Sequence, residues 1–239
     1  MIIYGINSVV EAIRAGIARK IWLSNRDDRR LAQVLSMAKR QGIEVRRVEN
    51  AVLNQFSQGV ANQGIVGEVA NPRKHSIEEL IVNSSRPTLI VVLDGIEDPQ
   101  NLGAIARSAE AAAVDAIVHQ TRRSAKVGAV ATKVSAGALA HVKLVPVVNI
   151  SRALDEIKNF GVWIVGFEAK ADIPYYALDM TQSIALVVGA EGKGIRRLVR
   201  EKCDWLASIP MHGHVSSLNV SVATGILLFE ALRQRTKVI

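Results

Sequence analysis

Three short polar segments in the second half of the chain contain the residue types that a catalytic or ligand-binding site needs. They are residues 94–103, 189–194 and 209–219. Each follows an apolar run of the kind that forms a buried strand. The carboxyl ends of parallel strands meet at one edge of an open α/β sheet, and ligands bind there. The sequence therefore predicts that the three segments converge on one site.

The charged and amide side chains of these segments are few, so each is informative. Asn101 and Asn219 stand at the start of expected helices, where an N-cap is the ordinary structural explanation. Arg107 lies six residues after Asn101 on a largely small and apolar helix, so it should have a specific partner or face a cleft. Glu191 is the only acid in its segment. Their joint occurrence after three apolar strands favours a site.

The glycines of the second segment do not form a phosphate-binding fingerprint. Gly189, Gly192 and Gly194 are spaced G-x-x-G-x-G, the wrong order for the dinucleotide motif, and Lys193 is not followed by Ser or Thr as in a P-loop. A nucleotide-dependent oxidoreductase is therefore disfavoured. The glycines indicate either close approach of the backbone to a ligand or positive φ angles, and a plain turn is the alternative.

Metal and cysteine chemistry have weak support in the sequence. His212 and His214 form a His-x-His pair with no third ligand nearby, so no metal is expected. Cys203 is the single cysteine, which excludes an internal disulfide framework. No His or Asn is placed to activate it as a nucleophile.

Strands and helices alternate from residue 87 onward, which predicts an α/β fold with a largely parallel sheet covered on both faces. The expected strands are residues 89–93, 116–118, 142–145, 162–167, 184–188 and 205–209. The expected helices are residues 102–112, 125–136, 151–159, 195–202 and 220–235.

The first 70 residues predict a second, smaller α/β unit. Its expected elements are a helix capped at Asn7 and Ser8 and ended by Gly16, a helix over 29–41, strands over 20–23, 43–48 and 64–69, and a loop over 54–63. Residues 71–86 have the composition of a linker, with a short helix over 77–82. The predicted domains are therefore 1–70 and 87–239. The small unit is rich in basic residues that we expect at its surface, where they form either an RNA-docking surface or an ordinary solvated face. These residues are Arg26, Arg29, Arg30, Lys39, Arg40, Arg46 and Arg47.

Composition narrows the class of protein and of partner. The chain is 49% hydrophobic and only 4% aromatic, so aliphatic residues must fill the core. It contains no bilayer-length apolar run and no signal-peptide pattern at its start, so we expect a soluble, cytoplasmic protein. The net charge is +8, which favours a polyanion such as nucleic acid as partner.

Three motifs, in this order along the chain, resemble those of the SpoU/TrmH family of RNA ribose 2′-O-methyltransferases in the SPOUT superfamily. They are Asn101-Leu-Gly-x-x-x-Arg107, Val188-Gly-Ala-Glu-Gly-x-Gly194 and Ile209-Pro-Met-x-Gly-x-Val-Ser-Ser-Leu-Asn-Val-Ser-Val-Ala223. The start Tyr4-Gly5-Ile-Asn-Ser-Val-Val-Glu-Ala resembles the substrate-binding domain of the type that modifies a guanosine of 23S rRNA. Departures from the usual pattern are His212, His214 and the pair Arg122-Arg123.

The resemblance implies a fold, a cofactor and partners. The fold is a C-terminal SPOUT α/β domain with a trefoil knot and a mostly parallel sheet, preceded by a small L7Ae/L30e-like α/β domain. The cofactor is S-adenosylmethionine, contacted at Gly189, Ile209 and Leu218. The substrate is RNA, foremost 23S rRNA, and the enzyme is a homodimer with its site near the interface. A tRNA ribose 2′-O-methyltransferase of the same family and a non-catalytic RNA-binding protein on the same fold are the alternatives.

The resemblance also implies roles for the polar residues. A guanidinium has a pKa above about 12 and is a poor base, so Arg107 is expected to hold the ribose 2′-oxygen and an adjacent phosphate. Glu191 is expected to orient Arg107 or to act as the base. Asn101, Ser217 and Asn219 are expected to position the ribose and shape the loops.

Overall fold

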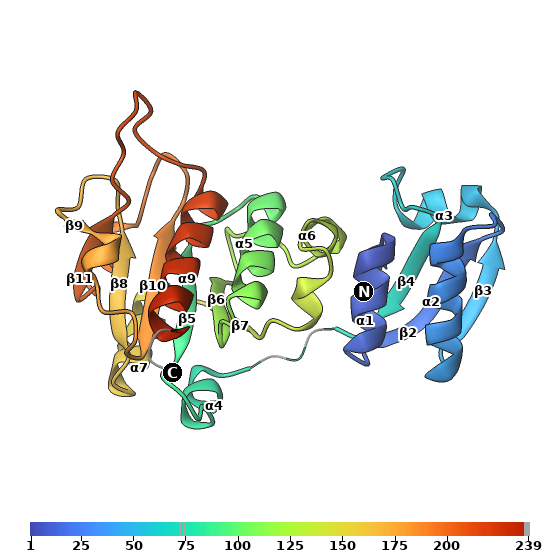
Figure 1. The fold of residues 1–239 in the computed structure, drawn as a ribbon, viewed down its shortest axis with the longest axis horizontal. Helices are drawn as coiled ribbons and strands as arrows, with labels where there is room; N and C mark the ends of the chain where they lie inside the picture. The colour runs from blue at the N-terminus through green and yellow to red at the C-terminus, as the bar shows by residue number, and fades with distance from the viewer. Residues whose placement is uncertain (72, 74, 237–239) are drawn as a thin grey trace. The chain divides into compact units, whose positions relative to one another are not determined.

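The computed structural model describes residues 1–71, 73 and 75–236. Contacts between residues divide the chain into two compact units (Figure 1). The smaller is the described part of Met1–Pro72 together with Lys126–His141, and the larger is Arg73–Ala125 together with the described part of Val142–Ile239. No helix in the described ranges is long and apolar enough to cross a membrane.

The larger unit is built on a parallel sheet with the strand order β7-β6-β5-β10-β8-β11-β9. Its strands are β5 (Leu89–Asp94), β6 (Ala116–Gln120), β7 (Leu144–Val147), β8 (Trp163–Phe167), β9 (Ile173–Pro174), β10 (Ile184–Gly189) and β11 (Trp205–Ser208). The predicted parallel α/β sheet is confirmed, with β9 as an addition. The chain runs outward from β5 to β7 and then crosses to the other side, so β5 and β10 meet where the strand order reverses, the place where such sheets bind ligands.

Helices cover both faces of this sheet. They are α4 (Ile77–Val82), α5 (Pro99–Ala111), α7 (Ile150–Asn159), α8 (Arg197–Arg200) and α9 (Val220–Thr236), with a 3-10 turn η2 (Tyr175–Ala177). Helices α5 and α9 pack side by side (Figure 1), and an added Cβ at Gly225 would lie only 3.6 Å from Ser108 Oγ. On the other face, alternate residues of β5 and β10, such as Val92 and Val187, pack in one apolar cluster with Leu154 and Val199.

Three helix boundaries differ from the sequence prediction for identifiable reasons. Helix α5 starts at Pro99 because Asp98 is its N-cap, whose Oδ1 accepts the backbone N–H of Gln100 at 2.8 Å. The helix expected over 195–202 is only α8, because the backbone N–H of Arg196 donates to Asp94 instead. The helix expected over 125–136 is only α6 (Ala129–Val134), because residue 125 is held in a loop.

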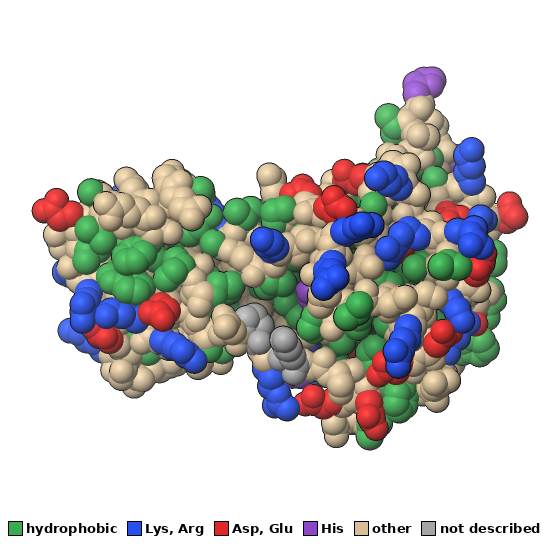
Figure 2. Space-filling view, turned by 180° about the vertical axis from the view of Figure 1, so that it is seen from behind, with side chains coloured by type: hydrophobic (Ala, Val, Ile, Leu, Met, Phe, Trp, Pro, Cys, Tyr) green, Lys and Arg blue, Asp and Glu red, His purple; other side chains and the backbone are tan. Residues whose placement is uncertain are grey.

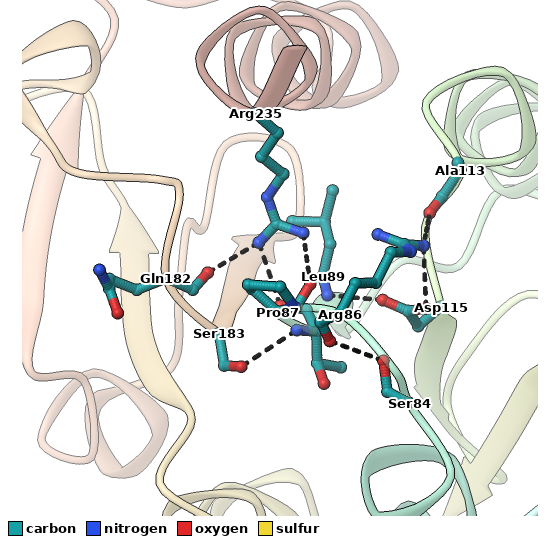
Figure 3. Close-up of polar contacts among 10 residues, drawn as sticks. Ser84, Arg86, Pro87, Leu89, Ala113, Asp115, Gln182, Ser183 and Arg235 are labelled. Carbon is teal, nitrogen blue, oxygen red and sulfur yellow. Dashed lines mark hydrogen bonds and ion pairs between the residues drawn. The ribbon is translucent and has the colours of Figure 1, made fainter. Parts of the chain in front are cut away.

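The C-terminal end of α9 is fastened to the amino-terminal ends of β5 and β10 (Figure 3). Arg235 donates hydrogen bonds to the carbonyl oxygens of Pro87, Thr88, Met180 and Gln182, at 2.7 to 3.2 Å. A planar guanidinium has several donors in a fixed fork, which suits this convergence of carbonyl groups. The last helix is thereby held across the sheet, with its first turn at the carboxyl edge.

The smaller unit has a mixed sheet of order β1-β4-β2-β3, in which only β2 and β3 are parallel. Its strands are β1 (Ile2–Tyr4), β2 (Ala18–Ser24), β3 (Glu44–Val48) and β4 (Ile65–Val69). Its helices are α1 (Ile6–Arg14), α2 (Arg29–Arg40), α3 (Asn50–Phe56) and α6, followed by a 3-10 turn η1 (Ala138–Ala140). The seven predicted surface cations are all exposed.

Two predictions for the smaller unit are wrong in detail. Helix α1 begins at Ile6, after Gly5 at φ 98°, and not at a cap formed by Asn7 and Ser8. Ser8 is buried inside the helix, where its hydroxyl donates to the carbonyl of Thr132 at 3.3 Å. Helix α3 occupies the start of the expected loop over 54–63, because Leu53 is fully buried against the sheet face that carries Tyr4.

Candidate active site

The three polar segments meet through a hydrogen-bonded junction of two amides and one carboxylate. Asn219 Nδ2 donates to Glu191 Oε1 at 2.6 Å and lies 3.0 Å from Asn101 Oδ1. Asn101 Nδ2 also donates to Glu191 Oε1, at 3.2 Å. These residues are up to 118 positions apart in the chain. The structure thus brings the segments after β5, β10 and β11 to one place.

Asn219 also caps the last helix, as the sequence predicted. Its Oδ1 accepts the backbone N–H groups of Ser221 at 2.9 Å and Val222 at 3.4 Å, so it is the N-cap of α9. Asn101 is not a cap, because Asp98 fills that place at the start of α5. The side chain of Asn101 is therefore available for the junction.

Arg107 lies on the third turn of α5 with an exposed side chain. Within the described residues it makes no hydrogen bond or ion pair, and Glu191 faces the two amides rather than this guanidinium. An arginine without an internal partner, two turns behind the junction residue Asn101, is available to an anionic ligand.

The 189–194 loop folds tightly onto itself. The N–H of Gly194 donates to the carbonyl of Ala190 at 2.8 Å. A Cβ added to Gly189 would lie 2.1 Å from the carbonyl carbon of Gly194, so only glycine fits. Gly192 and Gly194 have φ angles of 73° and 65°, which confirms the expected positive values. The close approach at Gly189 is to the loop's own backbone.

A buried carboxylate fixes the exit of this loop. Asp94, the last residue of β5, has a side chain with no exposed area. Its Oδ2 accepts the backbone N–H of Arg196 at 2.8 Å, and its Oδ1 accepts Nε of the same residue at 2.7 Å and also Nη2. Sequence reasoning singled out neither member of this pair, although an acid ending a fully apolar strand was the available signal.

The remaining expected site residues all lie on the segment between β11 and α9. Ile209 and Leu218 are half-buried, whereas Ser217 is exposed and makes no side-chain hydrogen bond to the described residues. His212 and His214 are exposed, and no group of three or more metal-ligating side chains occurs in the described ranges.

Cys203 is not an activated nucleophile. Burial raises the pKa of its thiol to about 12, and its Sγ donates to the carbonyl of Val199 at 3.5 Å. A thiol with so high a pKa carries almost no thiolate at neutral pH. The weak sequence case for cysteine chemistry therefore has no structural support.

Comparison with known proteins identifies the family. The SpoU rRNA methylase family model matches residues 88–229, and the model for the substrate-binding domain of RNA 2′-O ribose methyltransferases matches residues 2–75. The chain belongs to the SpoU rRNA methylase family.

Individual relatives agree over nearly the whole length. The chain is 44% identical over 239 residues to the 23S rRNA (guanosine-2′-O-)-methyltransferase RlmB of Yersinia pestis, covering 98% of this chain and 97% of the relative. It is 43% identical over 240 residues to RlmB of Escherichia coli strain K12, covering 98% of both. The SpoU methyltransferase AviRb from Streptomyces viridochromogenes, solved in complex with AdoMet, has the same fold, with a TM-score of 0.84, 24% identity, and coverage of 99% of this chain and 91% of AviRb.

Proposed function

We propose that this protein transfers a methyl group from S-adenosylmethionine to the ribose 2′-hydroxyl of a guanosine in 23S rRNA. The full-length relatives named for that reaction support the substrate. The observation that carries the chemistry is the junction of Asn101, Glu191 and Asn219, with the unpartnered Arg107 on the same helix as Asn101.

The segment after β11 has the chemistry that S-adenosylmethionine requires. Within the described residues, the backbone from 209 to 218 makes no hydrogen bond, so its N–H and C=O groups are free for a ligand. Half-buried Ile209 and Leu218 supply apolar surface at the two ends of that segment. Free backbone polar groups beside apolar side chains suit a purine nucleoside. We assign Ile209, Leu218 and the Gly189 loop to cofactor binding.

The sulfonium of S-adenosylmethionine supplies an already activated methyl group, so the protein must chiefly position the nucleophile and manage its proton. Arg107 holds the ribose 2′-oxygen and an adjacent phosphate, and stabilises the negative charge that develops on that oxygen. Glu191 is held at one carboxylate oxygen by two amides, which leaves Oε2 to accept the proton of the hydroxyl. Asn101, Ser217 and Asn219 orient the ribose around this carboxylate.

The roles of the domains and the oligomeric state are those that the family resemblance implies. Residues 1–70 are the RNA substrate-binding domain and residues 87–239 the methyltransferase domain, joined by 71–86. The enzyme is a homodimer, which is supported by Val222 and Phe229 on α9, 52% and 50% exposed. We place the enzyme in the cytoplasm, together with its ribosomal RNA substrate. The trefoil knot stays a prediction of the resemblance.

The test is methyl transfer from labelled S-adenosylmethionine to 23S rRNA that lacks modifications, followed by mapping of the methylated ribose. We expect one methylated guanosine, lost with Arg107→Ala. Transfer to tRNA instead would keep the chemistry and change the substrate. Tight RNA binding without transfer to any RNA would identify a non-catalytic binding protein.

A further inference from the structure

The cations of the larger unit fall into two sets. One set has partners within the described structure, which are carboxylates or, for Arg235, carbonyl oxygens: Arg73, Arg86, Lys158, Arg196, Arg197, Arg200, Lys202, Arg233 and Arg235. In the other set, no side-chain hydrogen bond or ion pair to a described residue occurs: Arg107, Arg122, Arg123, Lys143, Arg152, Lys170 and Lys193. Exposed Lys and Arg side chains are visible over this unit in Figure 2.

The unpartnered set is concentrated at one edge of the sheet. Only Lys143, which precedes β7, lies at the amino edge. Five others closely follow the carboxyl ends of strands β6, β7, β8 and β10, and Arg107 lies on the third turn of α5, the helix that follows β5. The site junction lies at this same edge, because its residues also follow carboxyl ends of strands.

Three of these cations follow neighbouring strands and have no acidic partner. Arg122 and Arg123 stand in the loop after β6, whose residues 121–125 contain no acid. Arg152 stands just beyond the loop after β7, in the first turn of α7, where the next acid along the helix, Asp155, pairs with Lys202 instead. The loops are neighbours, because the N–H of Thr121 donates to the carbonyl of Val147 at 2.9 Å. We call Arg122, Arg123 and Arg152 the arginine flank.

The flank is joined to the candidate active site through the backbone. The N–H of Ala125, at the end of the first flank loop, donates to the carbonyl of Ile96 at 2.7 Å. Ile96 belongs to segment 94–103, which also carries Asn101. An RNA strand lying along the loops that follow β6 and β7 would therefore continue directly to the junction.

Local stability does not account for the flank. Arg152 lies in the first turn of α7, where the positive end of the helix dipole disfavours a cation. Arg123 has φ 51°, a conformation that non-glycine residues adopt at a cost. Residues that break local rules without an internal compensation are typical of functional surfaces.

We propose that the arginine flank binds the phosphodiester backbone of the RNA strand whose ribose enters the site. Arginine suits phosphate because its planar fork donates two parallel hydrogen bonds. Contacts of this kind set the register of a nucleic acid without reading its bases. This inference rests on the proposed function for the identity of the site, but not for the binding of RNA.

The test compares the triple variant Arg122→Ala/Arg123→Ala/Arg152→Ala with wild type in RNA binding over a series of salt concentrations. The probe is the unmodified 23S rRNA used above. We expect Kd to rise about tenfold or more, and the slope of log K against log salt to shrink by about 2, at roughly 0.7 per lost phosphate contact. In methyl transfer, KM for RNA should rise while kcat at saturating RNA is kept, because such contacts are equal in ground and transition states.

Two controls make the result specific. Lys143→Ala removes another exposed and unpartnered cation, at the amino edge, and should leave Kd and the salt slope unchanged, whereas Arg123→Ala alone should lower the slope. The triple Arg→Lys variant keeps the charges and should retain most of the binding, which would attribute the loss in the triple Ala variant to the missing charges. Thermal unfolding of all variants should match wild type.

The outcomes separate the two proposals. If wild type methylates RNA and the triple Ala variant has the wild-type Kd, salt slope and KM, the proposed role of the arginine flank is wrong and the proposed function stands. If wild type methylates no RNA but the triple Ala variant loses salt-dependent RNA binding, the flank stands and the proposed function is wrong.

Discussion

Asp94 and Arg196 join the end of β5 to the exit of the glycine loop, although they are 102 residues apart in the chain. The carboxylate of Asp94 is fully buried, whereas the Arg196 side chain is 53% exposed. A buried charge is tolerated only when it is paired and hydrogen-bonded, and here the backbone N–H and the guanidinium do both. The pair therefore fixes the position of the loop that carries Glu191.

The two members of this pair should differ in what their loss costs. Asp94→Asn removes the negative charge and one of the two acceptor oxygens, and should lower the free energy of unfolding by about 1–3 kcal/mol. Arg196→Ala leaves the buried carboxylate without its counter-charge and should cost more, about 3 kcal/mol or above. Both should weaken S-adenosylmethionine binding, measured by calorimetry. Arg197→Ala, which removes only a surface pair with Glu201, should change neither quantity. Equal unfolding midpoints for all of these variants would contradict the assigned role of Asp94.

Gly189 should be irreplaceable for a steric reason. Its added Cβ would lie 2.1 to 2.4 Å from three backbone atoms of Gly194 and Ile195, which cannot move away as a side chain could. We expect Gly189→Ala to displace the loop, cost about 1–3 kcal/mol of stability and abolish cofactor binding. Gly128→Ala is the matched control, because it lies outside the proposed site and the nearest heavy atom to its added Cβ is 4.0 Å away. Cofactor binding by Gly189→Ala at wild-type affinity would show that the loop is not a cofactor contact.

Arg107 and Glu191 can be separated by conservative variants. Arg107→Lys keeps the charge but loses the fork, and we expect kcat to fall about 100-fold with little change in cofactor affinity. Glu191→Gln can still accept from both amides, so it keeps the junction and removes only the basic oxygen. We expect its kcat to fall by about 100-fold or more. If Glu191→Gln had near wild-type turnover, Glu191 would not be the base, and proton removal would depend on Arg107 and the substrate phosphate.

The fold was predictable wherever a local pattern was strong. Continuous apolar runs identified β5 and β10, and their alternation with helices predicted the parallel sheet. The two-residue strand β9 and the short helix α3 were missed, because their formation depends on pairing or burial against distant residues. The Asp98-Pro99 start of α5 was a readable signal, since proline favours the first helical turn, and it would have excluded Asn101 as the cap.

The sequence predicted which residues belong to the site better than it predicted the contacts between them. Polar residues after apolar strands sufficed to place Asn101, Glu191 and Asn219 together. Asp94 had a readable signal, an acid at the end of a fully apolar strand. Its pairing with Arg196 was not predictable, because an ion pair between remote residues has no signature in one sequence. The partners of Glu191 are likewise a property of the folded chain, in which two amides and not Arg107 contact the carboxylate.

The pH dependence of stability should report on His119 in β6. Burial lowers the pKa of this imidazole, although its contact with the carbonyl of Gln120 opposes the shift. The unfolded chain therefore binds a proton more readily than the folded chain, and stability falls as pH drops below the ordinary histidine pKa of about 6.5. We expect the midpoint of thermal unfolding to fall between pH 7.5 and 5.5. In His119→Gln this fall should be smaller, and an identical fall in both proteins would exclude His119 as a contributor.

The last turn of α9 should matter more for stability than its exposure suggests. Arg235 satisfies four carbonyl oxygens at the amino ends of β5 and β10, those of Pro87 and Gln182 being labelled in Figure 3, and its loss would leave some of them without a donor. We expect Arg235→Ala to lower the free energy of unfolding by about 2–3 kcal/mol in urea titrations. Arg235→Lys should recover only part of that loss, because an ammonium lacks the fixed fork. Arg197→Ala, which removes an exposed ion pair with Glu201, is the matched control and should unfold like wild type. These carbonyls lie at the amino edge, away from the junction, so the cofactor affinity of the folded Arg235→Ala variant should be unchanged. A loss of affinity would show that α9 transmits strain from its last turn to Asn219 at its first turn.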